Sequence, residues 1–128
     1  MPHLRVEYSA NLEDSNITAL CAALSGGLAA SGIFPVGGIR VRAYPAAHSA
    51  IADSDPENSF ADMVLRMGAG RSETEKKTTG DALMAIAARH FAGPLKGQHF
   101  ALSLEIVEID PKLSWRANTI HPRLQAQL

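Results

Sequence analysis

Hydrophobic and polar side chains alternate in four short segments of the chain. In residues 3–8 every second side chain is apolar, and the same period of two recurs in residues 39–44, 60–67 and 100–109. Such alternation is typical of strands that bury one face. In the last segment the apolar series slips at Val107, where we expect a bulge. The sequence therefore predicts four strands.

Two further segments carry apolar residues at helical spacing. The first follows the first predicted strand, and its apolar stripe consists of Ile17, Leu20, Cys21, Leu24 and Leu28. The second extends from Glu73 to Phe91, begins with a capping box of Ser72 and Glu75, and is stopped by Gly93-Pro94. Its inward face is expected to consist of Leu83, Ile86, Ala87, His90 and Phe91.

Two other segments lack a regular pattern. Residues 44–59 contain prolines, serines and acidic residues, a composition typical of a loop. Residues 115–128 follow the strand-ending Pro111, and we expect them to form a tail with at most one helical turn.

The predicted elements follow the order strand, helix, strand, loop, and then strand, helix, strand again. This order indicates two tandem βαβ units, residues 1–44 and 60–110, within a single domain that spans residues 1–128. We therefore predict an α+β fold in which a four-stranded mixed sheet carries both helices on one face. The charged side chains of the other face are Arg40, Arg42, Asp62 and Arg66. That face must meet either water or another subunit.

Composition narrows the functional classes. The chain has 12 Lys and Arg residues against 13 Asp and Glu residues, so nothing favours a nucleic acid or a membrane as a partner. The single cysteine, Cys21, excludes an internal disulfide, and no apolar run approaches the roughly 18 residues of a membrane span. The five histidines show no ligand spacing, so we expect no metal. We expect a soluble cytoplasmic protein.

The candidate for chemistry is Pro2, which directly follows Met1. Methionine is commonly removed before a residue as small as proline, and its removal would leave the Pro2 nitrogen as a free secondary amine. An α-amino group titrates at about 7.7–8.0, and burial or nearby cations lower that pKa towards the working range of a general base. Proline at the second position is common, however, and by itself does not indicate catalysis.

Five short segments, spread over nearly the whole chain, carry a resemblance to a known family. They are Met1-Pro2-His3 and residues 29–35, 38–42, 68–72 and 102–106. Together they resemble the 5-carboxymethyl-2-hydroxymuconate isomerases of the tautomerase superfamily, to which macrophage migration inhibitory factor also belongs. Residues 65–73 are similar to the strand, Gly-Arg-Ser turn and helix start of 4-oxalocrotonate tautomerase. The loop of residues 44–59 and the tail after Pro111 match less well.

The resemblance implies a homotrimer and an isomerase that needs no cofactor. The implied reaction converts 5-carboxymethyl-2-hydroxymuconate to its 2-oxo-3-ene isomer by moving a proton from oxygen to carbon, in the degradation of aromatic acids such as homoprotocatechuate. Pro2 matches the general acid and base of the family. Arg40 and Arg71 match residues that bind substrate carboxylates, a role that suits the planar and permanently charged guanidinium group. Arg42 and Asn118 are expected secondary contacts of the polycarboxylate substrate.

The two halves differ at the positions that this chemistry requires. An alignment through Arg71 places Ala61 where the first half has Pro2, and it places Ser103 where the first half has Arg40. The first half therefore keeps the proline and one arginine, while the second half keeps the other arginine. We predict one site per chain that uses parts of both halves, from neighbouring subunits.

The sequence leaves alternatives open. The chain could act on a different keto–enol acid, as a phenylpyruvate-type tautomerase or a hydratase-like relative does. It could instead be a non-enzymatic binding trimer of the same fold, like macrophage migration inhibitory factor. Without the resemblance, Arg40 and Arg71 are more readily explained as solvated residues of a strand and a turn. Two arginines favour a substrate with two or three carboxylates over a mono-acid.

Overall fold

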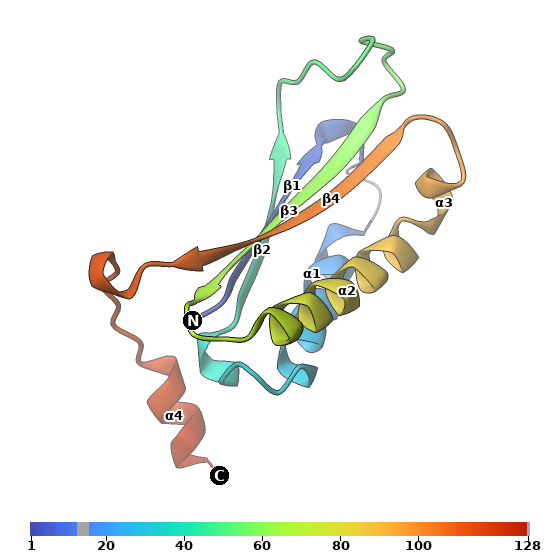
Figure 1. Ribbon diagram of the computed structural model, residues 1–128. Helices are drawn as coiled ribbons and strands as arrows, with labels where there is room; N and C mark the ends of the chain where they lie inside the picture. The colour runs from blue at the N-terminus through green and yellow to red at the C-terminus, as the bar shows by residue number, and fades with distance from the viewer. Residues whose placement is uncertain (13–15, 128) are drawn as a thin grey trace.

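The computed structural model describes residues 1–12 and 16–127 and shows one twisted sheet with two long helices beside it (Figure 1). The first half contains β1 (His3–Ser9), the 3-10 helix η1 (Ala10–Leu12), α1 (Ile17–Ala30), η2 (Val36–Gly38) and β2 (Arg40–Ala46). The second half contains β3 (Ser59–Gly68), α2 (Glu73–His90), α3 (Ala92–Leu95) and β4 (Phe100–Ile109). The chain then continues through η3 (Pro111–Leu113) to α4 (Ile120–Ala126). In the part of the chain that the structure describes, no helix has the length and apolar character needed to cross a membrane.

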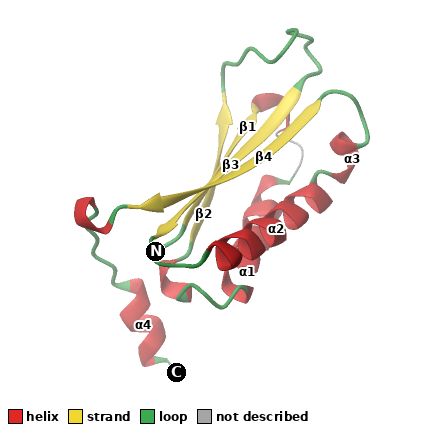
Figure 2. Ribbon diagram, in the orientation of Figure 1, coloured by secondary structure: helices red, strands yellow, loops and turns green. Residues whose placement is uncertain are grey.

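The sheet has the strand order β2-β1-β3-β4. Within each half the two strands are parallel and are joined through a helix, whereas β1 and β3 are antiparallel in the centre. The helices α1 and α2 lie on the same face of the sheet (Figure 2). The predicted α+β fold, a four-stranded mixed sheet with two helices on one face, is confirmed.

The core lies between the sheet and these two helices. Buried apolar side chains alternate along β1 and β3 and recur at helical spacing along α1 and α2, as the sequence periods predict. The fully buried side chains include Leu4, Val6, Met63, Leu65, Leu20, Leu24, Leu28, Leu83, Ala87 and Phe91. The remaining residues expected on the inner faces of the helices are only half-buried, namely Ile17, Cys21, Ile86 and His90.

The opposite face of the sheet is charged, and no helix in the described part of the chain covers it (Figure 2). The strand register places His3 between Arg40 and Arg66 in one row across this face. Exposed side chains farther along it include Arg5, Glu7, Asp62 and Glu105. This outer face is therefore open to water or to another subunit.

The predicted bulge at Val107 is wrong. The pairing of β3 with β4 is one-to-one along the whole of both strands, from Ser59 opposite Phe100 to Gly68 opposite Ile109. Val107 lies opposite Arg66 on the outer face and is 39% exposed. An apolar residue on the uncovered face requires no change of register, so the interruption of the apolar series did not indicate a bulge.

The tail is also more ordered than predicted. Instead of at most one helical turn it contains the seven-residue helix α4, which packs against η2. The side chain of Asn118 accepts hydrogen bonds from the amides of Ile120 at 2.8 Å and His121 at 3.1 Å, and these bonds support the first turn. A short helix that packs against a single 3-10 turn needs no long apolar stripe, so the sequence carries no helical period here.

The helix α2 begins with the predicted capping box. The Glu75 amide donates to Ser72 Oγ at 3.1 Å, and the Ser72 amide donates to the Glu75 carboxylate at 3.0 Å. These bonds satisfy amides that the helix itself leaves unpaired. They fix the start of α2 directly after Arg71.

We expect Ser72→Ala to lower the free energy of unfolding by about 1 kcal/mol, because the Glu75 amide loses its acceptor. Urea denaturation followed by circular dichroism measures the change. The control is Ser49→Ala, at an exposed loop position whose side chain forms no hydrogen bond with the described residues; it should change stability by less than about 0.5 kcal/mol. Equal effects of the two substitutions would contradict the role assigned to the cap.

Candidate active site

The first two residues of the chain lie beside the start of β2. The Arg40 amide donates a hydrogen bond to the Pro2 carbonyl at 3.1 Å, in the parallel register that pairs His3 with Arg40. Pro2 is fully buried, and Met1 is half-buried. Strand pairing therefore holds the chain end next to Arg40, as the predicted chemistry requires.

Two adjoining hollows share Met1 and Arg116 in their walls, and together we call them the chain-end site. The larger hollow measures about 550 Å³, and its wall also includes Pro35, Gly38, Arg71, Asn118 and His121. The smaller measures about 410 Å³, and its wall also includes His3, Arg40, Arg66 and Trp115. The structure thus gathers residues of both halves and of the tail around the chain end.

Arg71 comes from the turn between β3 and α2, and its guanidinium is held in place. Its Nε and Nη2 donate to the Ile33 carbonyl at 3.3 and 2.7 Å, and its Nη1 donates to the Gly68 carbonyl at 3.2 Å. Its Cζ lies 4.6 Å from the centroid of the Phe34 ring, a cation–π contact. Three of its five N–H donors are used, so two remain for a ligand.

The two predicted arginines of β2 have different surroundings. Arg40 lies in the site, where its Nη1 donates to the Gly38 carbonyl at 2.9 Å and approaches the Met1 sulfur at 3.7 Å. Arg42 lines neither hollow, and its Nη1 lies 3.0 Å from His3 Nδ1. The structure therefore brings Arg40 and Arg71 to the chain end, and it does not bring Arg42 there.

The chain-end site is strongly cationic. Burial lowers the pKa of the Met1 amino group, and the charges of Arg116, Arg71 and Arg40 lower it further, in that order. Among the described residues no carboxylate lines either hollow. Such a site is suited to bind an anion with several carboxylates and to keep an amine unprotonated.

Sequence reasoning missed Arg116 and His121, which line the larger hollow from the tail. Asn118, an expected secondary contact, also lies there and donates to the Gly37 carbonyl at 2.9 Å. The sequence offered one weak signal, since a basic residue stands two positions before Asn118. Its proximity to Met1 depends on how the tail folds back over η2, which no period in the sequence indicates.

The second half of the chain holds no equivalent site among its described residues. Ala61, which aligns with Pro2, is fully buried within β3 and pairs with Leu102. The next pair of residues in the second half is Asp62 and Ser103, which corresponds to His3 and Arg40 in the first half. Ser103 Oγ donates a hydrogen bond to an Asp62 carboxylate oxygen at 2.6 Å. One chain alone brings the chain end and both arginines together, so no neighbouring subunit is needed to assemble them.

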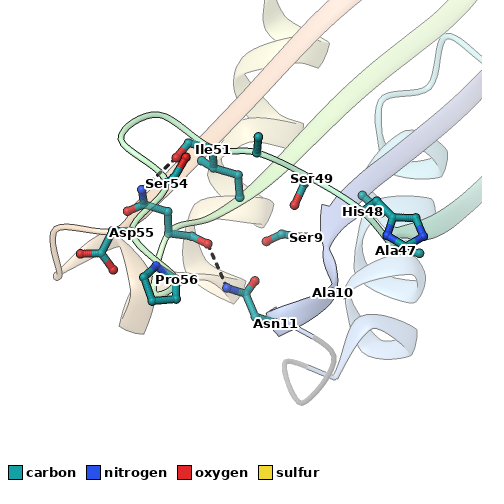
Figure 3. Close-up of a pocket in the computed structure, with 13 residues that line it drawn as sticks. Ser9, Ala10, Asn11, Ala47, His48, Ser49, Ile51, Ser54, Asp55 and Pro56 are labelled. Atoms are coloured by element: carbon teal, nitrogen blue, oxygen red, sulfur yellow. Dashed lines mark hydrogen bonds between the residues drawn. The ribbon is translucent and has the colours of Figure 1, made fainter.

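A separate hollow of about 480 Å³ lies at the other end of the strands, between the end of β1 and the loop of residues 47–58 (Figure 3). Several of its polar groups are paired within the protein. The Phe60 amide donates to Ser9 Oγ at 2.9 Å, and the Asn11 side chain donates to the Asn58 carbonyl at 2.9 Å. This hollow lies away from Pro2 and both predicted arginines, so we assign no chemistry to it.

A possible metal-binding group combines Asp55 and Glu57 of this loop with His99. One ligand atom of each residue lies within 4.8 Å of the other two. The His99 ring already contacts protein groups, with Nε2 3.2 Å from a Glu57 carboxylate oxygen and Nδ1 3.0 Å from Asn58 Oδ1. These residues come from two different loops, so their spacing in the sequence gave no indication of the group. Acidic groups of this kind are common on surfaces, and we assign no metal.

Comparison with known proteins decides the family. The sequence model of the 5-carboxymethyl-2-hydroxymuconate isomerase family matches residues 2–124. The chain belongs to this family. It is 37% identical over 122 residues to the 5-carboxymethyl-2-hydroxymuconate Delta-isomerase of Escherichia coli, with 94% of this chain and 97% of that protein covered. Membership of this isomerase family confirms the resemblance stated from the sequence, and it makes the chain an isomerase.

Solved structures agree with this assignment. The crystal structure of a 5-carboxymethyl-2-hydroxymuconate isomerase from Deinococcus radiodurans R1 superposes with a TM-score of 0.91 at 46% identity, covering 96% of this chain and 93% of that one. A fused 4-OT wild type symmetric trimer superposes with a TM-score of 0.66 at 16% identity, covering 88% and 91%. The second likeness shows the fold alone, and it supports the predicted tautomerase-like architecture of this family member.

His3, in the wall of the smaller hollow, is held as a neutral ring. A guanidinium only donates hydrogen bonds, so His3 Nδ1 must accept from Arg42 and cannot carry a proton. Burial lowers the pKa of His3, and so do the charges of Arg42, Arg66 and Arg40 and of the amino terminus. The folded chain therefore resists protonation of this histidine.

We expect this histidine to reduce the stability of the fold as the pH decreases below about 6.5, where the unfolded chain takes up a proton that the folded chain resists. The stabilisation that the neutral ring of His3 contributes is complete above that pH. It is lost progressively as the pH decreases towards the lower pKa of the folded state. Free energies of unfolding at about pH 7.5 and about pH 5.5 measure the effect. His3→Gln should reduce the difference, whereas His48→Gln in the exposed loop should not. An unchanged difference in His3→Gln would contradict the assignment.

Proposed function

We propose that the chain isomerises 5-carboxymethyl-2-hydroxymuconate to its 2-oxo-3-ene isomer, with the amine of Pro2 as general acid and base. The observation that carries the proposal is the position of Pro2, which is buried at the chain end beside Arg40 in a cationic site. The family and the names of the similar proteins support this substrate. A site with several arginines also fits a polycarboxylate better than a mono-acid such as phenylpyruvate.

The proposed chemistry requires the removal of Met1, which converts the Pro2 nitrogen from an amide to a secondary amine. The amine takes the proton of the 2-hydroxyl group. The electrons of the O–H bond form the C2 carbonyl, and the electron pair of the C2=C3 double bond forms a new double bond between C3 and C4. The electron pair of the C4=C5 double bond then takes a proton from the protonated amine at C5, which restores the free amine. Atoms and electrons balance, so the proposed reaction needs no cofactor. The substrate is a product of aromatic ring cleavage, so we place the reaction in homoprotocatechuate degradation.

The arginines have two roles in this proposal. Their charge keeps the amine unprotonated near neutral pH, in the same direction as the lowered pKa of the Met1 amino group. Arg40 binds the carboxylate next to the 2-hydroxyl group. It also stabilises the negative charge that develops on the C2 oxygen when the hydroxyl proton is removed. Arg71, which has two unused donors, binds the distal carboxylate. A substrate contact of Arg42 stays a prediction, because its guanidinium engages His3.

We further propose that the protein acts as a homotrimer. The charged outer face of the sheet is not covered by any helix of the described chain (Figure 2). A neighbour of the same fold is described as a symmetric trimer. Packing of three sheets through their outer faces would pair the exposed charges of this face across subunits.

The test of the proposed function compares the same chain with and without Met1. Protein that retains Met1, prepared while methionine aminopeptidase is inhibited, should isomerise 5-carboxymethyl-2-hydroxymuconate about 100- to 10,000-fold more slowly than after digestion with that peptidase, because an amide cannot act as a base. Intact mass confirms the digestion, and native mass spectrometry checks that both forms are trimers. Equal turnover by the two forms, or no turnover by the digested form, would show that the proposal is wrong.

We expect kcat/KM of the digested protein to rise with pH and then level off, because only the unprotonated amine is a base. The midpoint should lie below about 7.7–8.0, the ordinary range of an α-amino group, since burial and the arginines lower the pKa. Arg40→Ala should move the midpoint upwards, and Arg89→Ala, at an exposed position of α2 that lines neither hollow, should leave it in place. A midpoint that does not respond to Arg40→Ala would contradict the electrostatic role of this arginine.

A further inference from the structure

We propose that Arg116 is a further substrate-binding residue, which receives the carboxylate of the carboxymethyl group; this inference rests on the proposed function. A muconate carries two carboxylates, and the carboxymethyl substituent adds a third. Arg40 and Arg71 account for two of the three. Arg116 lines both hollows of the chain-end site, as Met1 does, and no other described residue lines both.

The guanidinium of Arg116 has more unused donors than either of the other two. Arg71 uses three of its five N–H groups on backbone carbonyls, and Arg40 directs its Nη1 to the Gly38 carbonyl and the Met1 sulfur. Among the residues that the structure describes, none accepts a hydrogen bond from Arg116 or forms an ion pair with it. Arg116 can therefore bind a carboxylate through two parallel hydrogen bonds without breaking a contact.

Arg116 is exposed, but the segment that carries it is anchored to the body of the protein. Asn118 donates to the Gly37 carbonyl at 2.9 Å and accepts from the amides of Ile120 and His121. Gly37 permits this close contact, because a Cβ at that position would lie 2.5 Å from His121 Cα. These contacts begin two residues after Arg116, so they hold its backbone at the rim of the site.

The field at the chain end supports the same conclusion. Of the three arginines that lower the pKa of the Met1 amino group, Arg116 has the largest effect. Its charge therefore acts on the chain end one residue before Pro2, whose nitrogen is the proposed base. A carboxylate bound there also neutralises charge that would otherwise remain unpaired beside Arg71 and Arg40.

Binding of two unreactive acids tests the inference without relying on turnover. Adipate has the two carboxylates of the muconate skeleton, and 2-(carboxymethyl)adipate adds the third. Calorimetric titration of the wild-type chain should show tighter binding of the tri-acid. Arg116→Ala should weaken binding of the tri-acid about tenfold and binding of adipate less than about twofold, because a hydrogen bond to a charged group is lost only in the first case. Arg116→Lys should retain part of the preference.

The matched control is Arg123→Ala, which removes an exposed arginine of α4 that lines neither hollow and should leave both affinities unchanged. Equal weakening of the two acids by Arg116→Ala overturns the inference, and so does no weakening of either. A wild-type chain without a preference for the tri-acid overturns it as well. A chain that prefers the tri-acid through Arg116 but does not isomerise the enol would overturn the proposed function and not this inference.

Discussion

The hydrogen bond from the Arg40 amide to the Pro2 carbonyl, at 3.1 Å, fixes the register in which β1 and β2 pair. Side chains alternate between the two faces of a strand, so a shift of one residue would place Arg40 in the core and Val41 outside. The same register buries Leu4 and Val6 under the helices. One pairing therefore determines both the packing of the first half and the position of its arginine relative to the chain end.

The parts of the fold that bury a wide face were predictable from the sequence. In the four strands apolar residues recur with a period of two, and in the two long helices they recur at helical spacing. The observed core consists mainly of these residues. The tail was not predictable in this way, because the Asn118 side chain anchors it through hydrogen bonds to backbone groups, and such bonds leave no period in the sequence. Arg40 and Arg71 were found through the family resemblance, since an arginine that binds substrate and one that meets water look alike in a strand or a turn. Arg116 lies outside the segments that carried the resemblance, and only the folded structure places it beside Met1.

Arg71 shows how one side chain can support the fold and the site together. Its bonds to the Ile33 and Gly68 carbonyls join the segment after α1 to the end of β3, and Phe34 stacks against its guanidinium. These contacts reduce the number of donors available to a ligand, but they also remove the freedom of a long side chain before a ligand arrives. A cation held in this way loses little conformational entropy on binding. The capping box that begins α2 directly after Arg71 restricts the turn further.

The tail contributes differently from the rest of the chain. In the described part of the chain, no residue beyond Ile109 belongs to the buried core, although Arg116, Asn118 and His121 line a hollow at the chain end. Substitutions of exposed residues usually alter stability little. Substitutions at residues 114–117 can therefore accumulate during evolution with little loss of stability in the sheet and helices. Each such substitution changes the surface that a ligand contacts. The sheet and helices can thus stay the same within a family while the tail changes which ligand is bound.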